Sequence, residues 1–350
     1  MNKHIATALV AIFILNSLPT LSHAASMSKT GWIPDPFMVE LEARARERAE
    51  AKAKAEAEEL AKRGYTETKY PIVLVHGLAG FTNLFGVISY FHTIPWNLER
   101  DGAKVYVASV AAFNSSEQRA ISLAKQIVPW AAENGGKVHL IGHSQGAPTS
   151  RIAASLRPDL VASVTSVSGV NKGSKVADLL AGDLKVHFLV DWALRAVSGG
   201  VTGIVSRILD SFGKETDSMA ALKTLTTKGS IELNRKYPWG VNSSSYCAKS
   251  TEMQKVHGYD IRYYSWTGKF SSTNYYDPLD WLLKLTGMIY GEENSDGLVG
   301  VCSTYLGEVI GTDYHMNHAD TINHLFGIKG NADPVSLYRQ HANRLKNKGL

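Results

Sequence analysis

A single serine stands between two glycines in Gly142-His-Ser-Gln-Gly146, directly after the apolar run Val138–Ile141. The glycines predict a sharp turn from a strand into a helix, and Pro148 fits the first turn of that helix, where its missing N–H costs little. Such a turn lifts the hydroxyl of Ser144 clear of the sheet, where it can act as a nucleophile. A glycine turn with an inert serine is the alternative, because this five-residue pattern also arises by chance.

A nucleophilic serine needs a base to take its proton and an acid to orient that base. On this kind of turn the order along the chain is serine, then acid, then histidine. The histidines after Ser144 are His187, His257, His315, His318, His324 and His341. Order makes the last four eligible as the base. The candidate acids are Asp277, Asp280, Asp296 and Asp313. Spacing alone does not choose among them, and each taken singly is more often an ordinary polar loop residue.

Attack on a carbonyl also needs backbone donors for the negative charge that develops on its oxygen. The N–H of Gln145, directly after the serine, can supply one donor. The turn His76-Gly-Leu-Ala-Gly80 ends an apolar run and is placed to supply another through Leu78. A phosphate-binding loop is the other reading of this turn, but it lacks the glycine spacing of either common nucleotide-binding pattern.

Short apolar runs alternate with helix-length segments around these residues. The runs cover 72–75, 105–108, 138–141 and 161–167, and helix-length segments include 116–132 and 145–156. This alternation predicts an α/β fold with a mostly parallel sheet and helices on both faces. Sites in such sheets lie at the carboxyl ends of the strands, which is where the serine turn and the glycine-rich turn fall.

The N-terminus has the order of a secretory signal. Lys3 precedes the apolar stretch Ile5–Leu15, and Ser22-His-Ala24 offers small residues for cleavage. We therefore expect residues 1–24 to be removed and the mature protein to be secreted through the periplasm, since the apolar stretch is too short for a comfortable membrane span. Residues 25–65 predict a charged helical extension without a wide apolar stripe, and 66–350 the catalytic domain.

The charge composition gives information on one class of binding partner, nucleic acids. The chain has 350 residues and a formal net charge of +5, with lysine and arginine interleaved with acids, which gives little support for a nucleic-acid partner. Its two cysteines, Cys247 and Cys302, are expected to form a disulfide in an oxidising compartment, with two buried thiols as the alternative.

Several ordered motifs resemble the secreted true lipases of Gram-negative bacteria, of the Pseudomonas and Burkholderia type, which have the α/β-hydrolase fold. The likeness extends from about Lys69 to Leu350 and shows in Tyr70-Pro-Ile-Val-Leu-Val-His-Gly77, Asp101-Gly-Ala-Lys-Val-Tyr-Val107, Ile141-Gly-His-Ser-Gln-Gly146, Tyr263-Tyr-Ser-Trp266, Ser295-Asp-Gly-Leu-Val-Gly300, Met316-Asn-His318 and Tyr338-Arg-Gln-His-Ala-Asn-Arg-Leu-Lys346. The resemblance implies that Asp296 is the catalytic acid, His318 the general base, and Leu78 and Gln145 the oxyanion donors.

The resemblance further implies a structural calcium ion near the catalytic histidine. Its ligands would be the carboxylates of Asp277 and Asp320 and the main-chain carbonyls of His324 and Ile328, hard oxygen donors of the kind that calcium prefers. It also implies the Cys247–Cys302 disulfide and a dedicated membrane-anchored foldase. The sequence departs from many relatives at Leu78-Ala79 in the glycine-rich turn, at Ala147 after the serine turn, and at His324.

A movable apolar cover is expected over the site of a lipase. Residues 183–236 interrupt the strand pattern, and an apolar face recurs at helical spacing through Val201, Ile204, Val205, Ile208, Leu209 and Phe212, with a hinge at 198–200. The sequence thus predicts a triacylglycerol lipase that hydrolyses long-chain acylglycerols at a lipid–water interface. A carboxylesterase for soluble short-chain esters is the alternative, followed by a non-catalytic binding protein of the same fold.

Overall fold

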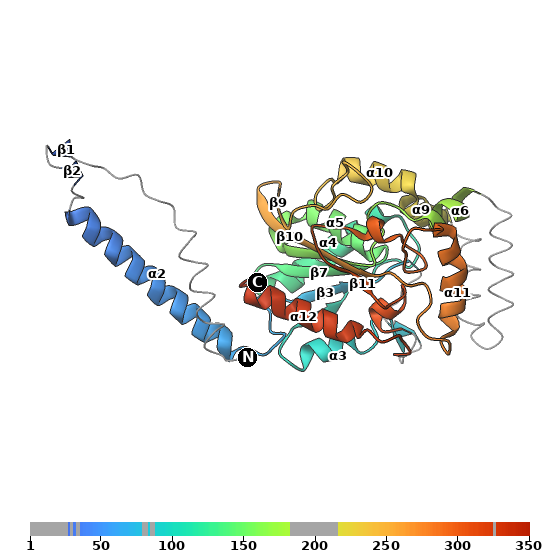
Figure 1. The fold of residues 1–350 in the computed structure, drawn as a ribbon, viewed down its shortest axis with the longest axis horizontal. Coiled ribbons are helices and arrows are strands. Elements are labelled where there is room, and N and C mark those ends of the chain that lie inside the picture. The colour runs from blue at the N-terminus through green and yellow to red at the C-terminus, as the bar shows by residue number, and fades with distance from the viewer. Residues whose placement is uncertain are drawn as a thin grey trace. The chain divides into compact units, whose positions relative to one another are not determined.

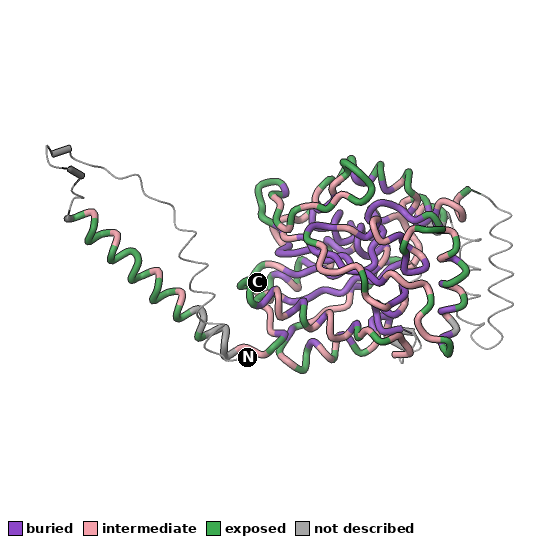
Figure 2. The backbone as a smooth tube through the Cα atoms, viewed as in Figure 1, coloured by how far each residue is buried: buried purple, intermediate pink, exposed green. Residues whose placement is uncertain are grey.

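The computed structural model describes residues 27–28, 31–32, 36–78, 83–84, 88–182, 216–324 and 327–350. The chain divides into two compact units, Met1–Gly64 and Tyr65–Leu350 (Figure 1). The first unit contains the antiparallel strands β1 (Met27–Ser28) and β2 (Gly31–Trp32) and the helix α2 (Pro36–Lys62). Most described side chains of α2 are exposed, so the helix is solvated, as its charge pattern predicts (Figure 2). The segment 1–24 lies outside the described residues.

A mainly parallel sheet forms the centre of the second unit. Its strands are β3 (Ile72–Val75), β6 (Val105–Val107), β7 (Val138–His143), β8 (Val161–Val167), β9 (Met253–Val256), β10 (Tyr259–Gly268) and β11 (Glu308–Tyr314). They follow the order β11-β10-β8-β7-β3-β6, and β9 alone among them is antiparallel, along β10. A separate two-stranded pair joins β4 (Asn83–Leu84) to β5 (Ile88–Ser89). The predicted α/β class is confirmed.

Helices cover both faces of this sheet (Figure 1). The described helices of this unit are α3 (Ile94–Glu99), α4 (Ser116–Ala132), α5 (Gly146–Leu156), α6 (Lys175–Gly182), α9 (Thr216–Leu225), α10 (Thr227–Lys236), α11 (Pro278–Gly287) and α12 (Pro334–Asn347). Short 3-10 helices lie at Pro158–Leu160, Met288–Tyr290, Val301–Thr304 and Asp320–Ile322. The predicted cover over 183–236 is described only in part: 183–215, with the apolar face and the hinge, lie outside the described residues, and α9 and α10 occupy the rest.

The side chains of β3 point alternately to the two faces of the sheet, and each face packs into its own buried cluster. Val73 packs into one buried cluster with side chains of α4 and α5, whereas Leu74 packs into another with side chains of α3 and α12. Successive side chains of a strand point to opposite faces, so an apolar run becomes a strand that is buried on both sides. All four residues of β3 are buried.

The predicted disulfide is present. Cys247 and Cys302 are bonded, with their Cα atoms 4.7 Å apart and a sequence separation of 55. On the chain-entropy model, closing a loop of this length stabilises the fold by about 4 kcal/mol. Lys172 reinforces the same loop, because its buried ammonium group donates to the carbonyl oxygens of Tyr246 at 2.8 Å and of Ala248 at 2.9 Å.

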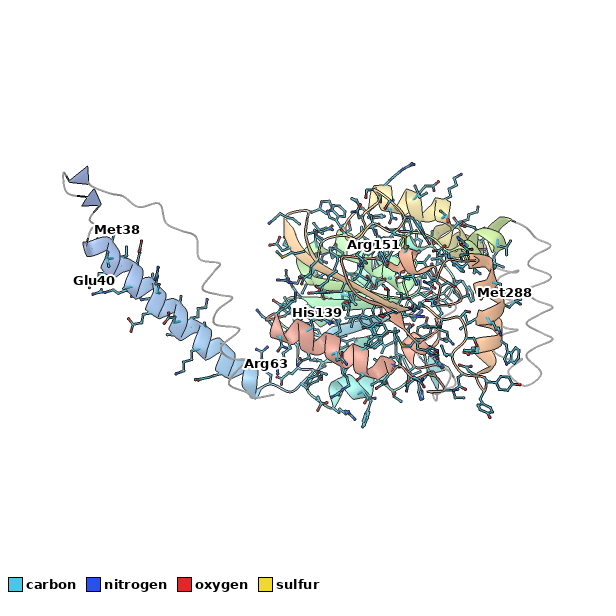
Figure 3. The ribbon with its side chains drawn as sticks, in the orientation of Figure 1. Met38, Glu40, Arg63, His139, Arg151 and Met288 are labelled. Atoms are coloured by element: carbon cyan, nitrogen blue, oxygen red, sulfur yellow. A yellow bond between two sulfur atoms is a disulfide. The ribbon has the colours of Figure 1, made fainter. Side chains whose placement is uncertain are left out.

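Four buried histidines make the folded state sensitive to acid. Burial lowers the pKa of His76 to about 4 and that of His139, which lies on β7 (Figure 3), to about 3. Burial also holds the pKa values of His143 and His341 well below 6.5. Each ring is neutral in the folded protein and takes up a proton when the chain unfolds below pH 6.5. Their stabilising contribution is therefore complete above that pH and is lost as the pH falls.

We expect the free energy of unfolding to fall below pH 6.5 by about 1.4 kcal/mol per pH unit for each buried histidine that gains a proton on unfolding. Urea titrations at about pH 7 and about pH 5 measure the change. The variant His139→Gln removes one such ring and should show a shallower dependence on pH than the parent protein. Identical dependences in the two proteins would contradict the assignment.

Candidate active site

The serine turn connects β7 to α5. Ser144 has φ 55°, a left-handed conformation that is costly for a residue with a side chain and is retained where the surroundings impose it. Its N–H donates to the carbonyl oxygen of Val167 at 3.1 Å, and its own carbonyl accepts from the N–H of Ala147 at 3.1 Å. These bonds fix the serine between the end of one strand and the start of a helix.

Glycines are required around this serine because backbone segments meet there. A Cβ atom at Gly142 would collide with the backbone of Gly146, and one at Gly146 would collide with the carbonyl of Val75. A Cβ atom at Gly77 would come within 2.7 Å of the Cβ of Ser144. The glycine-rich turn after β3 and the serine turn after β7 therefore lie directly against each other.

An acid and a histidine are joined nearby. Nδ1 of His318 lies 2.8 Å from Oδ2 of Asp296, and the His318 N–H donates to the Asp296 carbonyl at 2.8 Å. The other carboxylate oxygen, Oδ1, accepts from the N–H groups of Leu298 at 3.1 Å and Val299 at 2.8 Å. The carboxylate is fully buried, so these donors and the imidazole replace water around its charge. A proton on Nδ1 leaves Nε2 of His318 as the basic nitrogen.

The histidine loop packs against the residue that precedes the serine. The rings of His143 and His318 are 4.6 Å apart between centroids, and Nε2 of His143 lies 3.1 Å from the carbonyl oxygen of His318. This contact joins the serine turn to the loop that carries the candidate base. His143, which directly precedes Ser144, therefore contacts the loop that carries His318.

The other histidines that follow Ser144 in the chain occupy other environments. His341 is in the core, with Nε2 2.8 Å from the hydroxyl of Thr165, and His324 Nε2 lies 3.0 Å from the Ser89 carbonyl. His315 packs on the ring of Phe270, and His257 on that of Trp239. His187 lies outside the described residues. The ring of His318 lies within hydrogen-bond distance of a carboxylate, that of Asp296.

The other candidate acids also differ from Asp296. Asp280 is buried and accepts from Nδ2 of Asn317 at 2.6 Å, one residue before His318. Asp277 caps the N-terminus of α11 through Leu279 N–H at 2.8 Å, and Asp313 is exposed on β11. Asp280 thus braces the histidine loop without contacting the ring.

The glycine-rich turn is held by two buried side chains that sequence reasoning missed. Nη1 of Arg119 donates to the Gly77 carbonyl at 3.0 Å, and its Nη2 donates to the carbonyl of His76. From the other side, the Tyr90 hydroxyl accepts from Gly77 N–H at 3.0 Å. The main chain leading to Leu78 is therefore fixed by side chains from α4 and from the segment before α3.

Two of the proposed calcium ligands, Asp277 and Asp320, are buried acids. Oδ2 of Asp320 accepts from the Thr273 hydroxyl at 2.6 Å and from Asn317 N–H at 3.0 Å, but Oδ1 has no hydrogen-bond partner among the described residues. Burial raises the pKa of Asp320 to about 6. Asp277 is also fully buried. A buried carboxylate with an unsatisfied oxygen suits a hard cation, so the donor set fits calcium.

No cluster of three or more His, Cys, Asp or Glu side chains suited to a metal occurs in the described parts of the chain. A site built from two carboxylates and main-chain carbonyls does not need one. No helix among the described residues is long and apolar enough to cross a membrane.

Comparison with known proteins places this geometry in context. The model of the alpha/beta hydrolase fold matches residues 70–318. A triacylglycerol lipase of Vibrio cholerae is 50% identical over 83% of this chain and 92% of its own length. One from Pseudomonas fragi is 39% identical over 81% of this chain and 98% of its own. The solved structure of EstA from Clostridium botulinum shares the fold, with a TM-score of 0.55 and 17% identity over 96% of this chain and 97% of that one.

Proposed function

This chain belongs to the alpha/beta hydrolase family, and from that membership we propose that it is a triacylglycerol lipase acting through an acyl-enzyme. The observation that carries the proposal is the buried Asp296–His318 pair, whose histidine lies on the loop that packs against the turn of Ser144. Relatives named triacylglycerol lipase, at 36 to 50% identity over most of the chain, support the substrate class.

The chemistry follows from the arrangement of these groups. His318 accepts the proton of the Ser144 hydroxyl through Nε2 as the serine oxygen bonds to the ester carbonyl carbon. The N–H groups of Leu78 and Gln145 donate hydrogen bonds to the carbonyl oxygen and stabilise the negative charge that develops on it. The protonated histidine then gives its proton to the departing glycerol oxygen, which leaves an acyl ester on Ser144. A water molecule, deprotonated by His318, attacks that ester, and His318 returns the proton to the Ser144 oxygen as the fatty acid is released. Asp296 stabilises the imidazolium in both halves of the reaction.

Two substrates separate a lipase from its alternatives. We expect the protein to hydrolyse an emulsified long-chain triacylglycerol, with a rate that rises when the substrate exceeds its solubility and an interface forms. Activity confined to a dissolved short-chain ester would instead identify a carboxylesterase. Folded, disulfide-bonded protein that hydrolyses neither substrate would support a non-catalytic binding protein.

Calcium is part of the proposal. Asp277 and Asp320 would hold it with the carbonyls of His324 and Ile328, and its charge would neutralise the two buried carboxylates. Because Asp320 is two residues beyond His318, the bound ion would stabilise the loop that carries the base.

Removal of calcium by a chelator should lower the melting temperature by several degrees, because an ion bound only by the folded state stabilises it by about 2.7 kcal/mol at a hundred times its Kd. Added calcium should restore the value. The variant Asp277→Asn, which retains the size of the side chain, should respond to neither treatment. A melting temperature of the parent protein that is indifferent to the chelator would count against the site.

Export and assistance in folding complete the proposal. The sequence of residues 1–24 and the disulfide Cys247–Cys302 support secretion through the periplasm, where a dedicated foldase would assist the chain. Expression with and without the signal, followed by assay of the culture medium, tests the export.

A further inference from the structure

Large apolar side chains gather on the outer face of α11 and on the residues next to it. The exposed fractions of these side chains are 76% for Tyr275, 84% for Tyr276, 49% for Trp281, 46% for Leu285 and 74% for Met288. We call these five residues the α11 patch. Met288 lies just beyond the last residue of α11, at the edge of the domain (Figure 3).

The patch is continuous because of helical spacing and ring contacts. Trp281, Leu285 and Met288 are four and three residues apart, so they lie on one face of the helix. The ring of Tyr275 lies 5.6 Å from that of Trp281 and 5.8 Å from that of Tyr276, between centroids. Contiguous apolar surface of this kind marks an interaction site more often than scattered exposed residues do.

The opposite face of α11 packs on the loop of the catalytic acid. Leu283 is buried, and a Cβ atom at Gly297 would lie 2.8 Å from the Cβ of Leu283. Gly297 directly follows Asp296, and Asp277 caps the start of the same helix. The helix therefore connects the catalytic loop on one side with an apolar surface on the other.

We propose that the α11 patch is a surface through which the protein adsorbs to a lipid aggregate. This inference rests on the proposed function, because the substrate of a triacylglycerol lipase is itself such an aggregate. Tyrosine and tryptophan combine an apolar ring with a polar group and favour the boundary between water and lipid. Lys284 is exposed on the same helix, while the one acid of α11, Asp280, is buried. The exposed charge on α11 itself is thus positive and suits anionic headgroups.

The decisive test compares matched exposed residues in a Ser144→Ala background, where adsorption is not followed by turnover. Trp281→Glu and Met288→Glu introduce a charge into the patch. Trp96→Glu and Met253→Glu do the same at exposed residues outside it. Binding to vesicles of phosphatidylcholine with a fraction of phosphatidylglycerol is measured by sedimentation. We expect the partition coefficient to fall about tenfold or more for each patch variant and to change little for the controls.

A fluorescent label gives a second measurement, which detects contact with lipid directly and does not require a variant that binds vesicles more weakly. Both native cysteines are in the disulfide, so Met288→Cys and Met253→Cys each provide a single thiol for an environment-sensitive dye. The emission at residue 288 should shift to the blue when vesicles are added, and that at residue 253 should stay unchanged. Equal behaviour of the two labels would overturn the proposal.

Separate outcomes distinguish this proposal from the function on which it rests. With Ser144 intact, rates on a dissolved short-chain ester report folding and catalysis and should stay within about twofold in the patch variants, since exposed substitutions change stability little. If the parent protein failed to hydrolyse any ester, the vesicle assay would still decide the role of the patch. Unchanged partition, together with conversion of a dimer to a monomer by Trp281→Glu, would overturn the lipid assignment and make the patch a contact between two copies of the chain.

Discussion

Replacement of Ser144 by alanine should lower kcat on emulsified triacylglycerol and on a dissolved ester by about 10⁴- to 10⁶-fold, as loss of the nucleophile does in other serine hydrolases. The change removes one oxygen and leaves the Cβ, so the turn can retain its backbone conformation. Initial rates and the thermal unfolding curve of the two proteins measure the effect. The melting temperature should change little.

A matched serine provides the control. Ser168 follows β8 as Ser144 follows β7, and it also has a positive φ, 46°. Its hydroxyl is buried and lies 3.0 Å from that of Thr267. Ser168→Ala should therefore retain most of the activity. A Ser144→Ala protein that still hydrolysed either ester at more than a few per cent of the parent rate would exclude Ser144 as the nucleophile.

Asp296→Asn should lower kcat by about 10³- to 10⁴-fold while the protein remains folded. The amide oxygen of the asparagine can still accept hydrogen bonds from the N–H groups of Leu298 and Val299, so the loop should keep its conformation. The side chain that meets Nδ1 of His318, however, no longer carries the charge that favours a proton there. The ring then adopts the wrong tautomer more often, and the imidazolium that forms in the reaction is no longer stabilised.

The comparison variant for this change is Asp313→Asn. Asp313 is a candidate acid by chain order but is exposed on β11, so its neutralisation should leave kcat unchanged. Steady-state rates at several pH values measure both variants. If Asp313→Asn were the less active of the two, the assignment of the acid would be wrong.

The part of the site that depends on neighbours in sequence was predictable. Five consecutive residues from Gly142 to Gly146 specify the serine turn, because a Cβ at either glycine would collide with backbone. The choice of Asp296 and His318 was not readable from spacing. Their pairing depends on loops 22 residues apart, and the contact from His143 to His318 spans 175 residues. Motif resemblance, not periodicity, selected them.

The buried support of the glycine-rich turn was not predictable at all. Arginine is rarely buried without a partner, so Arg119 in a helix reads as a surface residue. Its partners in the glycine-rich turn are main-chain carbonyls 42 and 43 residues earlier, which have no residue-specific signature. The Tyr90 hydroxyl likewise accepts from Gly77 N–H only because the folded chain brings these two residues together. Such contacts appear only when the elements are packed.

Trapping the nucleophile tests the proposed acyl-enzyme mechanism most directly. The protein is incubated with a long-chain alkyl phosphonate ester, a reagent that bonds to an activated serine, and the modified peptide is identified by mass spectrometry. We predict stoichiometric labelling of Ser144, loss of activity in parallel, and no labelling in the Asp296→Asn protein over the same time. A label on another residue, or full inactivation without a label on Ser144, would contradict the acyl-enzyme mechanism proposed for this chain.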